Sequence, residues 1–283
     1  MKGPAALEGT TRARPGAFGF LTDTTLCIGC KACEVACKQW NQLPMDDFGF
    51  TGMSYDNTGD LGATTWRHVA FIERISDREG RRPTTLAPFQ SNWLMLSDVC
   101  KHCVHAGCME ACPTGAIIRT EFDTVVIQQD ICNGCGYCVP ACPFGVPALS
   151  PLDGKAHKCT LCYDRLKDGL EPACAKACPT DAIQFGPVHA LMDRARARVS
   201  ELRAQGVEAR IYGDQALGGT GGIGGLNAFF ILTAPPEVYN LPAKPELPQR
   251  RVLPAFLTTA LAALALGIAT LFSFRRVGRM QHG

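Results

Sequence analysis

The pattern of hydrophobic and polar positions predicts a mixture of helices and short strands. Residues 252–274, VLPAFLTTALAALALGIATLFSF, carry no charge. Residues 189–206, HALMDRARARVSELRAQG, have the spacing of an amphipathic helix that ends at Gly206. Residues 115–129 predict a small β-hairpin in which GAIIRT and TVVIQQ flank the polar turn EFD, and residues 226–233, LNAFFILT, predict a strand.

The C-terminal apolar segment is long enough to cross a membrane. As a helix with a rise of about 1.5 Å per residue, it extends roughly 35 Å, against a hydrocarbon core of about 30 Å. A buried core helix is the alternative. The segment is apolar on all sides, a proline-rich stretch at 235–251 precedes it, and arginines follow it directly. We therefore predict a transmembrane helix at 252–274 and a short tail at 275–283.

Cysteine is the residue type that most restricts the chemistry of this chain. The 283 residues include 16 cysteines, all of which fall into four groups. The groups are Cys27, Cys30, Cys33 and Cys37; Cys100, Cys103, Cys108 and Cys112; Cys132, Cys135, Cys138 and Cys142; and Cys159, Cys162, Cys174 and Cys178. Groups one and three have the spacing C-x2-C-x2-C-x3-C, group two has C-x2-C-x4-C-x3-C, and group four has C-x2-C-x11-C-x3-C. A proline follows the last cysteine of every group except the first, where Lys38 stands.

Three chemistries use thiols at such a density: disulfide scaffolds, zinc sites and iron–sulfur clusters. Cysteines two or three residues apart rarely form a disulfide, because the bond needs a particular separation and direction of the Cα atoms. Disulfide scaffolds are also typically small secreted chains, and we find no apolar signal core in the first residues. Structural zinc sites use two converging pairs of ligands. The run C-x2-C-x2-C-x3-C-P is typical of bacterial ferredoxins, in which the fourth cysteine ligates the other of two clusters.

Local features support loops that bind iron–sulfur clusters. Gly29, Gly134 and Gly136 stand where such a loop must turn sharply. The proline after the fourth cysteine stops the helical turn that carries it. The heptapeptide ACPTGAI at 111–117 recurs as ACPTDAI at 177–183. Since two groups make an interlocked pair of clusters, four groups predict two such pairs.

With these motifs the chain resembles the four-cluster iron–sulfur subunits of membrane-bound molybdopterin oxidoreductases, and most closely the β subunit of respiratory formate dehydrogenase. The resemblance covers about residues 20–275 and includes LCIGCKACEVAC, ICNGCGYCVPACPFGVPALS and KCTLCYDRLKDGLEPACAKACPTDAIQFG. It implies an α+β fold of two interlocked bacterial-ferredoxin-like 2[4Fe–4S] modules with a single C-terminal transmembrane helix. It also implies four [4Fe–4S] clusters.

The resemblance further implies that group one pairs with group four, and group two with group three. The implied ligands are Cys27, Cys30, Cys33 and Cys178 for cluster 1; Cys159, Cys162, Cys174 and Cys37 for cluster 2; Cys100, Cys103, Cys108 and Cys142 for cluster 3; and Cys132, Cys135, Cys138 and Cys112 for cluster 4. The expected organisation is an N-terminal extension at 1–19, a discontinuous first module at 20–95 and 146–190, an inserted second module at 96–145, a peripheral helix and glycine-rich segment at 191–234, a proline-rich linker at 235–251, the transmembrane helix at 252–274 and the tail at 275–283.

On this resemblance the chain is a non-catalytic electron-transfer subunit. A molybdenum- or tungsten-pterin α subunit would oxidise formate, and a haem b γ subunit in the membrane would pass the electrons to quinone. The cluster modules are expected outside the cytoplasm and the C-terminus inside, with anchoring from the cytoplasmic side as the alternative. We find no nucleophile–base motif, P-loop or substrate-binding signature in the sequence, and a net charge of +2 gives no reason to expect nucleic-acid binding.

Several alternatives stay open at this point. The same relay could serve a polysulfide, thiosulfate or dimethyl sulfoxide reductase, or the chain could be a structural metal-binding scaffold. GTGGIG at 219–224 matches a dinucleotide-binding pattern, but a strand follows it where a helix is required. His102 and His105 could replace a thiolate, and His102 could instead form a hydrogen bond near a cluster or face solvent. Lys101, Lys155 and Lys158 could raise a reduction potential or lie at the surface.

Overall fold

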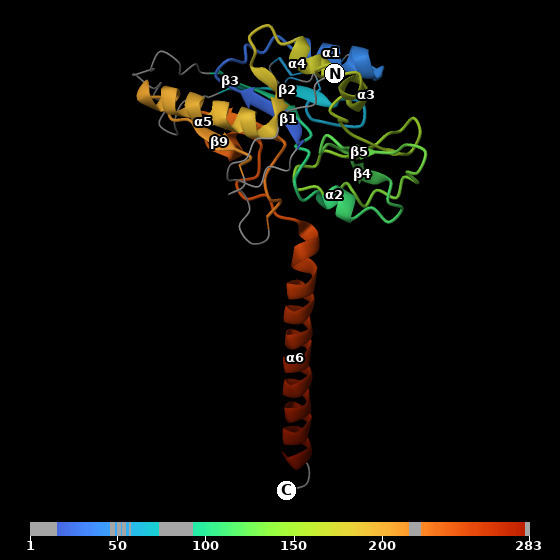
Figure 1. Ribbon diagram of the computed structural model, residues 1–283. Coiled ribbons are helices and arrows are strands. Elements are labelled where there is room, and N and C mark those ends of the chain that lie inside the picture. Colours follow the sequence, from blue (N-terminus) through green and yellow to red (C-terminus); the bar gives the residue numbers. More distant parts are fainter. Residues whose placement is uncertain are drawn as a thin grey trace.

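A four-stranded mixed sheet forms the centre of the body, with the strand order β8–β1–β10–β9 (Figure 1). The computed structural model describes residues 16–45, 49, 52, 55–56, 58–73, 93–214 and 222–280. The strands of this sheet are β1 (Phe18–Asp23), β8 (Ile183–Pro187), β9 (Arg210–Tyr212) and β10 (Ala228–Leu232). Strand β1 pairs antiparallel with β8 and parallel with β10, while β9 pairs antiparallel with β10. Every residue of β10, AFFIL, is buried, as expected for a central strand covered on both faces, and the strand predicted at 226–233 is confirmed.

Helix α5 (Val188–Ala204) packs against this sheet through one apolar stripe. Its buried residues are Leu191, Ala195, Val199 and Leu202, whose spacing of three and four places them on a single face. They share a hydrophobic core with β10. The chain leaves the helix at Gly206, which has a φ of 80° and ends it as a left-handed cap residue. The predicted amphipathic helix is confirmed.

Short antiparallel ribbons and short helices complete the body. The ribbons are β2 (Arg67–Glu73) with β3 (Trp93–Val99), β4 (Ile117–Arg119) with β5 (Val125–Ile127), and β6 (Ala148–Leu149) with β7 (Ala156–His157). The helices are α1 (Ala32–Asn41), α2 (Gly107–Glu110), α3 (Tyr163–Lys167), α4 (Ala173–Lys176) and the 3₁₀ helices η2 (Pro236–Tyr239) and η3 (Pro248–Arg251). The hairpin predicted at 115–129 is confirmed by the pairing of β4 with β5. The structure has the mixed α and β content expected from the sequence.

Two further apolar clusters contain cysteines of different groups. The larger one packs Phe20, Val69 and Leu161 against thiols. Its buried cysteines are Cys33, Cys100, Cys159 and Cys174. The smaller one joins β4 and β5 to Cys108 and Cys138. The cysteines therefore contribute to the hydrophobic core of the protein, and groups distant in sequence meet there.

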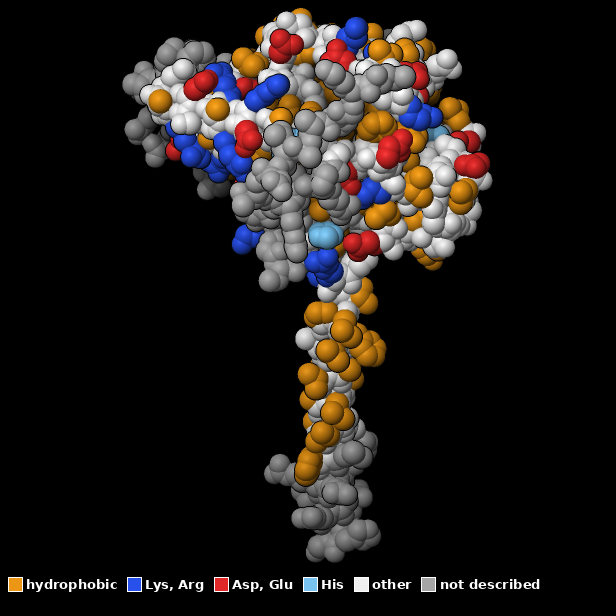
Figure 2. All heavy atoms as spheres, viewed as in Figure 1, with side chains coloured by type: hydrophobic (Ala, Val, Ile, Leu, Met, Phe, Trp, Pro, Cys, Tyr) orange, Lys and Arg blue, Asp and Glu red, His pale blue; other side chains and the backbone are white. Residues whose placement is uncertain are grey.

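One long helix, α6 (Val252–Met280), extends away from the body (Figure 1). The side chains at 252–270 are all exposed, and Figure 2 shows apolar groups along this stretch of the helix. By length and composition, residues 248–270 can cross a membrane. This window begins four residues before the predicted span at 252–274, and the helix itself continues into the predicted tail. A surface of this kind suits burial in lipid.

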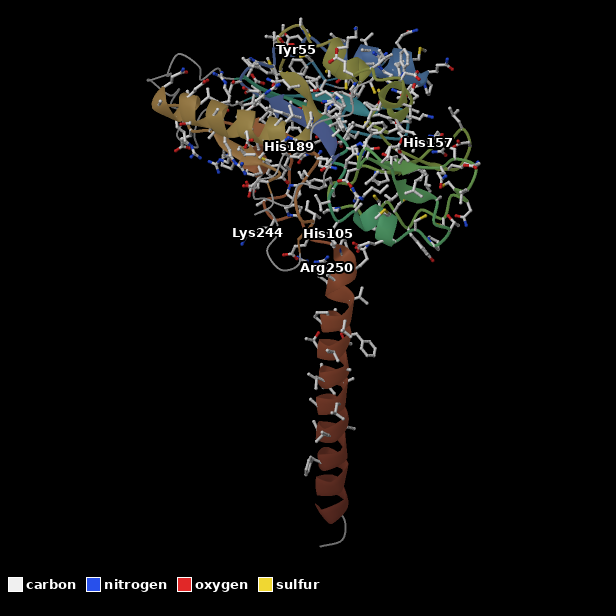
Figure 3. The ribbon with its side chains drawn as sticks, viewed as in Figure 1. Tyr55, His105, His157, His189, Lys244 and Arg250 are labelled. Carbon is white, nitrogen blue, oxygen red and sulfur yellow. The ribbon has the colours of Figure 1, made fainter. Side chains whose placement is uncertain are left out.

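The start of α6 is attached to the half of the body that contains group two. Leu247 is buried, and Gln249 Nε2 donates a hydrogen bond to the carbonyl oxygen of Gly107 in α2 (2.7 Å). Figure 3 shows His105 of group two and Arg250 at the end of the body where α6 begins. Tyr55 lies at the opposite end, where its ring contacts Phe71 (5.8 Å between centroids), close to the first cysteine loop. Group one is therefore the part of the body far from α6.

Two expectations fall wholly or partly outside this description. Most of the predicted N-terminal extension at 1–19 lies outside the described residues, which begin at 16. Residues 219–221 of the GTGGIG motif also lie outside them, and the described part of the chain after the motif leads into β10.

Candidate metal centres

A cavity lined by four cysteines lies beside the start of α1. Its walls contain three cysteines of group one and the last cysteine of group four. These are Cys27, Cys30, Cys33 and Cys178, which we call site 1. Val69 and Ser97 also line the cavity, so the ribbon of β2 and β3 forms one of its walls.

A second cavity has the same construction in the other half of the body. It is lined by three cysteines of group two and the last cysteine of group three. These are Cys100, Cys103, Cys108 and Cys142, which we call site 3. Both cavities therefore combine three thiols from one group with the last thiol of another.

The remaining cysteines form two sets, in each of which neighbouring thiols raise the pKa of one buried member. We call Cys37, Cys159, Cys162 and Cys174 site 2, and Cys112, Cys132, Cys135 and Cys138 site 4. Burial raises the pKa of Cys37, and the neighbouring Cys174 and Cys162 raise it further. Burial also raises the pKa of Cys138 to about 11, and the other three cysteines of site 4 act in the same direction. All sixteen cysteines proposed as ligands thus lie in four sets of four.

The four sites lie in a row from site 1 to site 4. Thiols of each site interact electrostatically with thiols of the next, for example Cys33 with Cys174, Cys159 with Cys100, and Cys108 with Cys138. In each pair, burial is the main cause of the raised pKa of the first thiol, and the second thiol adds to it. The ends of the row differ from its middle. Cys30 of site 1 and Cys135 of site 4 are exposed, whereas every cysteine of site 2 is buried.

The same backbone turn recurs in all four cysteine groups. The residue before the second cysteine has a positive φ each time: 67° at Gly29, 42° at His102, 74° at Gly134 and 59° at Leu161. Glycine adopts this conformation without strain, but histidine and leucine do not. The side chains of His102 and Leu161 are fully buried, so packing holds these two turns in place. The glycines were recognisable in the sequence as turn residues, and the other two residues were not.

A Gly134→Ala substitution is expected to destabilise the protein and lower its iron content. An added Cβ would lie 2.2 Å from the carbonyl oxygen of Gly154, and the φ of 74° is strained for alanine. The strain alone costs about 1–3 kcal/mol. Gly145→Ala is the matched control, because its φ is 63° and a Cβ there meets no atom within 4 Å. Thermal unfolding with iron analysis measures both, and equal effects of the two substitutions would contradict the steric argument.

The residue after the fourth cysteine decides how far each short helix continues. Lys38 allows α1 to continue from Cys37 to Asn41, and Asn41 Nδ2 donates a hydrogen bond to the sulfur of Cys37 (3.6 Å). Helices α2 and α4 instead end before Cys112 and Cys178, where proline follows. In the repeated CPT sequence, a threonine hydroxyl lies 3.6 Å from Cys112 Sγ and 3.9 Å from Cys178 Sγ. The sequence repeat is therefore also a repeat of structure.

Two lysines and one histidine beside the cysteine groups are buried inside the row of sites. Lys158 Nζ donates to the carbonyl oxygens of Val125 and of Cys159, the latter at 3.0 Å. Lys101 is buried too and pairs with Asp98. Burial lowers the pKa of His102, and its Nδ1 accepts a hydrogen bond from the Val125 amide (3.0 Å), so Nε2 carries the proton. The surface interpretation is therefore wrong for Lys101, Lys158 and His102.

The donor chemistry of the sites fits iron–sulfur clusters. Every site offers thiols alone as its four predicted ligands, and soft thiolate sulfur is the ligand type that iron–sulfur clusters use. Within the described ranges, no three cysteine, histidine or acidic side chains converge closely enough for a single metal ion. Four thiols can provide one ligand for each iron of a four-iron cluster.

Two family models match the chain. A model of the 4Fe-4S dicluster domain matches residues 91–188, and a model of the 4Fe-4S binding domain matches residues 24–42. Together they cover all sixteen cysteines. With the four sets of thiols, they define the protein as an electron-transfer protein of the ferredoxin type that carries [4Fe–4S] clusters.

Similar proteins identify the family more closely. The chain is 40% identical over 232 residues to the iron–sulfur subunit of nitrate-inducible formate dehydrogenase from Escherichia coli, covering 80% of this chain and 73% of that one. It is 38% identical over 252 residues to the formate dehydrogenase iron–sulfur subunit of Haemophilus influenzae, covering 87% and 75%. The B subunit of anaerobic dimethyl sulfoxide reductase from E. coli is 33% identical over 187 residues, covering 66% and 80%. The chain belongs to the family of formate dehydrogenase iron–sulfur subunits.

Proposed function

We propose that this chain relays electrons from a molybdenum- or tungsten-pterin subunit that oxidises formate to a haem b subunit in the membrane that reduces quinone. The observation that carries the proposal is the row of four all-cysteine sites, because the half of the row that contains group two adjoins the start of α6. The names of the relatives supply formate as the substrate of the catalytic partner.

We assign the sixteen cysteines as the ligands of four [4Fe–4S] clusters, one at each of sites 1 to 4. Each cluster, when bound, takes up and releases one electron at a time. The chain supplies the thiolates, keeps water from the central sites by burial, and directs hydrogen bonds at the sulfurs. Asn41 at site 2 and Ser97 at site 1 are examples of such hydrogen-bond partners.

We further propose two interlocked ferredoxin-like modules, the first made by sites 1 and 2 and the second by sites 3 and 4. Support comes from the exchange of the fourth cysteine between groups within each half of the row. The pairing of β1 with β8 supports a discontinuous first module at 20–95 and 146–190, because it sets Phe20 opposite Phe185 and so joins the two segments. The second module, at 96–145, is inserted between these segments.

Electrons enter at site 1 and leave at site 4 in this proposal. The exposed thiols of Cys30 and Cys135 at the two ends support it, since these are the exposed cysteines among the described residues and a partner can approach them. Large exposed apolar side chains lie near both ends, including Ile28 and Val35 beside site 1 and Tyr137 beside site 4. Such side chains are typical of surfaces that bind other proteins.

Helix α6 serves as a membrane anchor and as a docking helix for the haem b subunit. A single helix cannot form a pore, and its exposed apolar surface is suited to both lipid and neighbouring helices. We propose that the body lies outside the cytoplasm and the C-terminus inside. Protease treatment of intact spheroplasts tests this orientation, because cleavage of the body is expected there and protection would place the body in the cytoplasm.

A dimethyl sulfoxide, polysulfide or thiosulfate reductase is the second candidate for the catalytic partner. The match to the B subunit of dimethyl sulfoxide reductase favours it, but that match covers a smaller share of this chain than the formate dehydrogenase relatives do. A structural scaffold is the third candidate, and metal content separates it from an electron relay.

Anaerobic purification in mild detergent is expected to yield this chain with a pterin-containing subunit and a haem b subunit. The chain should carry about sixteen iron and sixteen sulfide. Formate should reduce the complex, whereas dimethyl sulfoxide or polysulfide should oxidise it if the second candidate is correct. Zinc in place of iron, with no partner subunit, would overturn the relay.

A further inference from the structure

Arg67 is buried between sites 1 and 2 without an acidic partner. It is the first residue of β2, and only 1% of its surface is exposed. Its guanidinium lies over the ring of Phe20, 4.7 Å from the centroid. No carboxylate in the described part of the chain forms an ion pair with it. A buried cation is costly unless other negative charge surrounds it.

The guanidinium satisfies only some of its hydrogen-bond donors with protein oxygen. Nη1 donates to the carbonyl oxygen of Ser97 (3.3 Å) and to its hydroxyl Oγ (3.2 Å). Nε and Nη2 are buried and meet no acceptor within the described residues. Arginine remains charged under all ordinary conditions, so this is a permanent positive charge in the core.

Cysteines of both neighbouring sites surround this charge. Cys33, Cys159 and Cys174 share an apolar cluster with Phe20, the ring beneath the guanidinium. Burial acts to lower the pKa of Arg67, but the negative charge that Cys174, Cys33, Cys159 and Cys37 carry when deprotonated as ligands raises it above its usual value. Cys33 belongs to site 1 and the other three belong to site 2. The negative charge that balances Arg67 therefore comes from the cysteines of the two sites, whereas in a surface ion pair it comes from a carboxylate.

Ser97 connects Arg67 to one ligand of site 1. The hydroxyl oxygen of Ser97 lies 3.2 Å from the sulfur of Cys33. Because this oxygen accepts a hydrogen bond from Arg67, its own proton is available for donation to the sulfur. The pairing of β2 with β3 sets Val69 opposite Ser97 and Arg67 opposite Val99, so Arg67 and Ser97 lie diagonally on one face of the ribbon.

We propose that Arg67, directly and through Ser97, is a positioning residue that raises the reduction potentials of the clusters at sites 1 and 2. The inference rests on the proposed ligand sets. Reduction adds one negative charge to a cluster, and a fixed cation in a water-free site stabilises that charge. Hydrogen bonds to ligand sulfur act in the same direction. Site 1 receives both effects, whereas site 2 receives the charge alone.

A redox titration followed by electron paramagnetic resonance tests the inference on the complete complex. Arg67→Gln is expected to lower the reduction equilibrium constants of the clusters at sites 1 and 2 about tenfold, which is about 59 mV for a one-electron couple. The reduction potentials of the clusters at sites 3 and 4 should not change. Arg67→Lys keeps the charge and should restore most of the potential. Ser97→Ala should lower the reduction potential of the cluster at site 1 alone. Arg210→Gln, which removes a more exposed arginine in β9, is the control and should shift none.

The signals are assigned to sites by their loss in single cysteine variants such as Cys27→Ser. Four clusters at wild-type potentials in Arg67→Gln would overturn the inference and leave the relay intact. Should Arg67→Gln fail to hold four clusters, Ser97→Ala decides, because a shift at site 1 supports the inference and no shift overturns it. A wild-type protein without clusters would instead overturn the proposed function.

Discussion

A Cys132→Ser variant is expected to lose quinone reduction while it keeps formate oxidation with an artificial acceptor. Cys132 belongs to site 4, the last in the row, and a serine hydroxyl does not replace a soft thiolate ligand. Sites 1 to 3 do not contain this residue and should keep their clusters. Even substitutions in the outer shell of a metal site cost about 10–100-fold in affinity or activity, so loss of a ligand should exceed tenfold.

The measurement compares two activities and one spectrum in the same preparation. Quinone reduction should fall, dye reduction should stay near the wild-type rate, and one cluster signal should be missing. Ile131→Ser is the matched control, since it places the same new side chain next to Cys132 at a partly exposed position that holds no proposed ligand. Unchanged quinone reduction without the site 4 signal would contradict a linear relay.

A chain that stops after Arg251 is expected to keep its clusters and lose its attachment to the membrane. This truncation retains η3, including the hydrogen bond from Gln249 to Gly107, and removes only α6. Helix α6 packs chiefly against η3, and its side chains at 252–270 are exposed, so the body should fold without it. Burial of apolar surface in lipid amounts to about 25 cal/mol for each Å², so loss of the whole helix should release the protein completely.

Fractionation of cells measures the result, with iron analysis of the released protein. Iron per chain should match the full-length protein, and quinone reduction should be lost with the membrane attachment. Leu264→Ala is the control, because it leaves the helix apolar and should leave the protein in the membrane. Release of an iron-free chain would contradict the separation of anchor and body.

The cysteine groups made most of the metal chemistry predictable from the sequence. The covalent chain itself fixes the spacing of these thiols. Three thiols in one tight loop can therefore face a cluster wherever the loop lies in the fold. The run of apolar residues at 252–274 predicted α6 for a similar reason, because length and composition alone define it. The amphipathic spacing of Leu191, Ala195 and Val199 likewise predicted α5. The ligand sets and the interlocked modules remain proposals.

Features that depend on tertiary packing could not be predicted in this way. The positive φ at His102 and Leu161 exists because surrounding side chains hold it, and neither residue type indicates such a turn. Lys158 is buried because carbonyl oxygens from two separate segments meet its amine. Nothing in the sequence indicated that Arg67 lies beside the sites, since it stands 30 residues after Cys37 and the ribbon of β2 and β3 brings it there.

The pairing of β1 with strands from the second half of the chain has a consequence for biosynthesis. Strand β1 lies between β8 and β10, whose residues leave the ribosome more than 150 residues after it. The cavity that joins Cys27 to Cys178 therefore cannot form until most of the chain has been translated. All cysteines of groups two and three, in contrast, have been synthesised once residue 142 is added. Since contacts between distant segments form slowly, the half nearer α6 can be completed first, and the half far from it closes last.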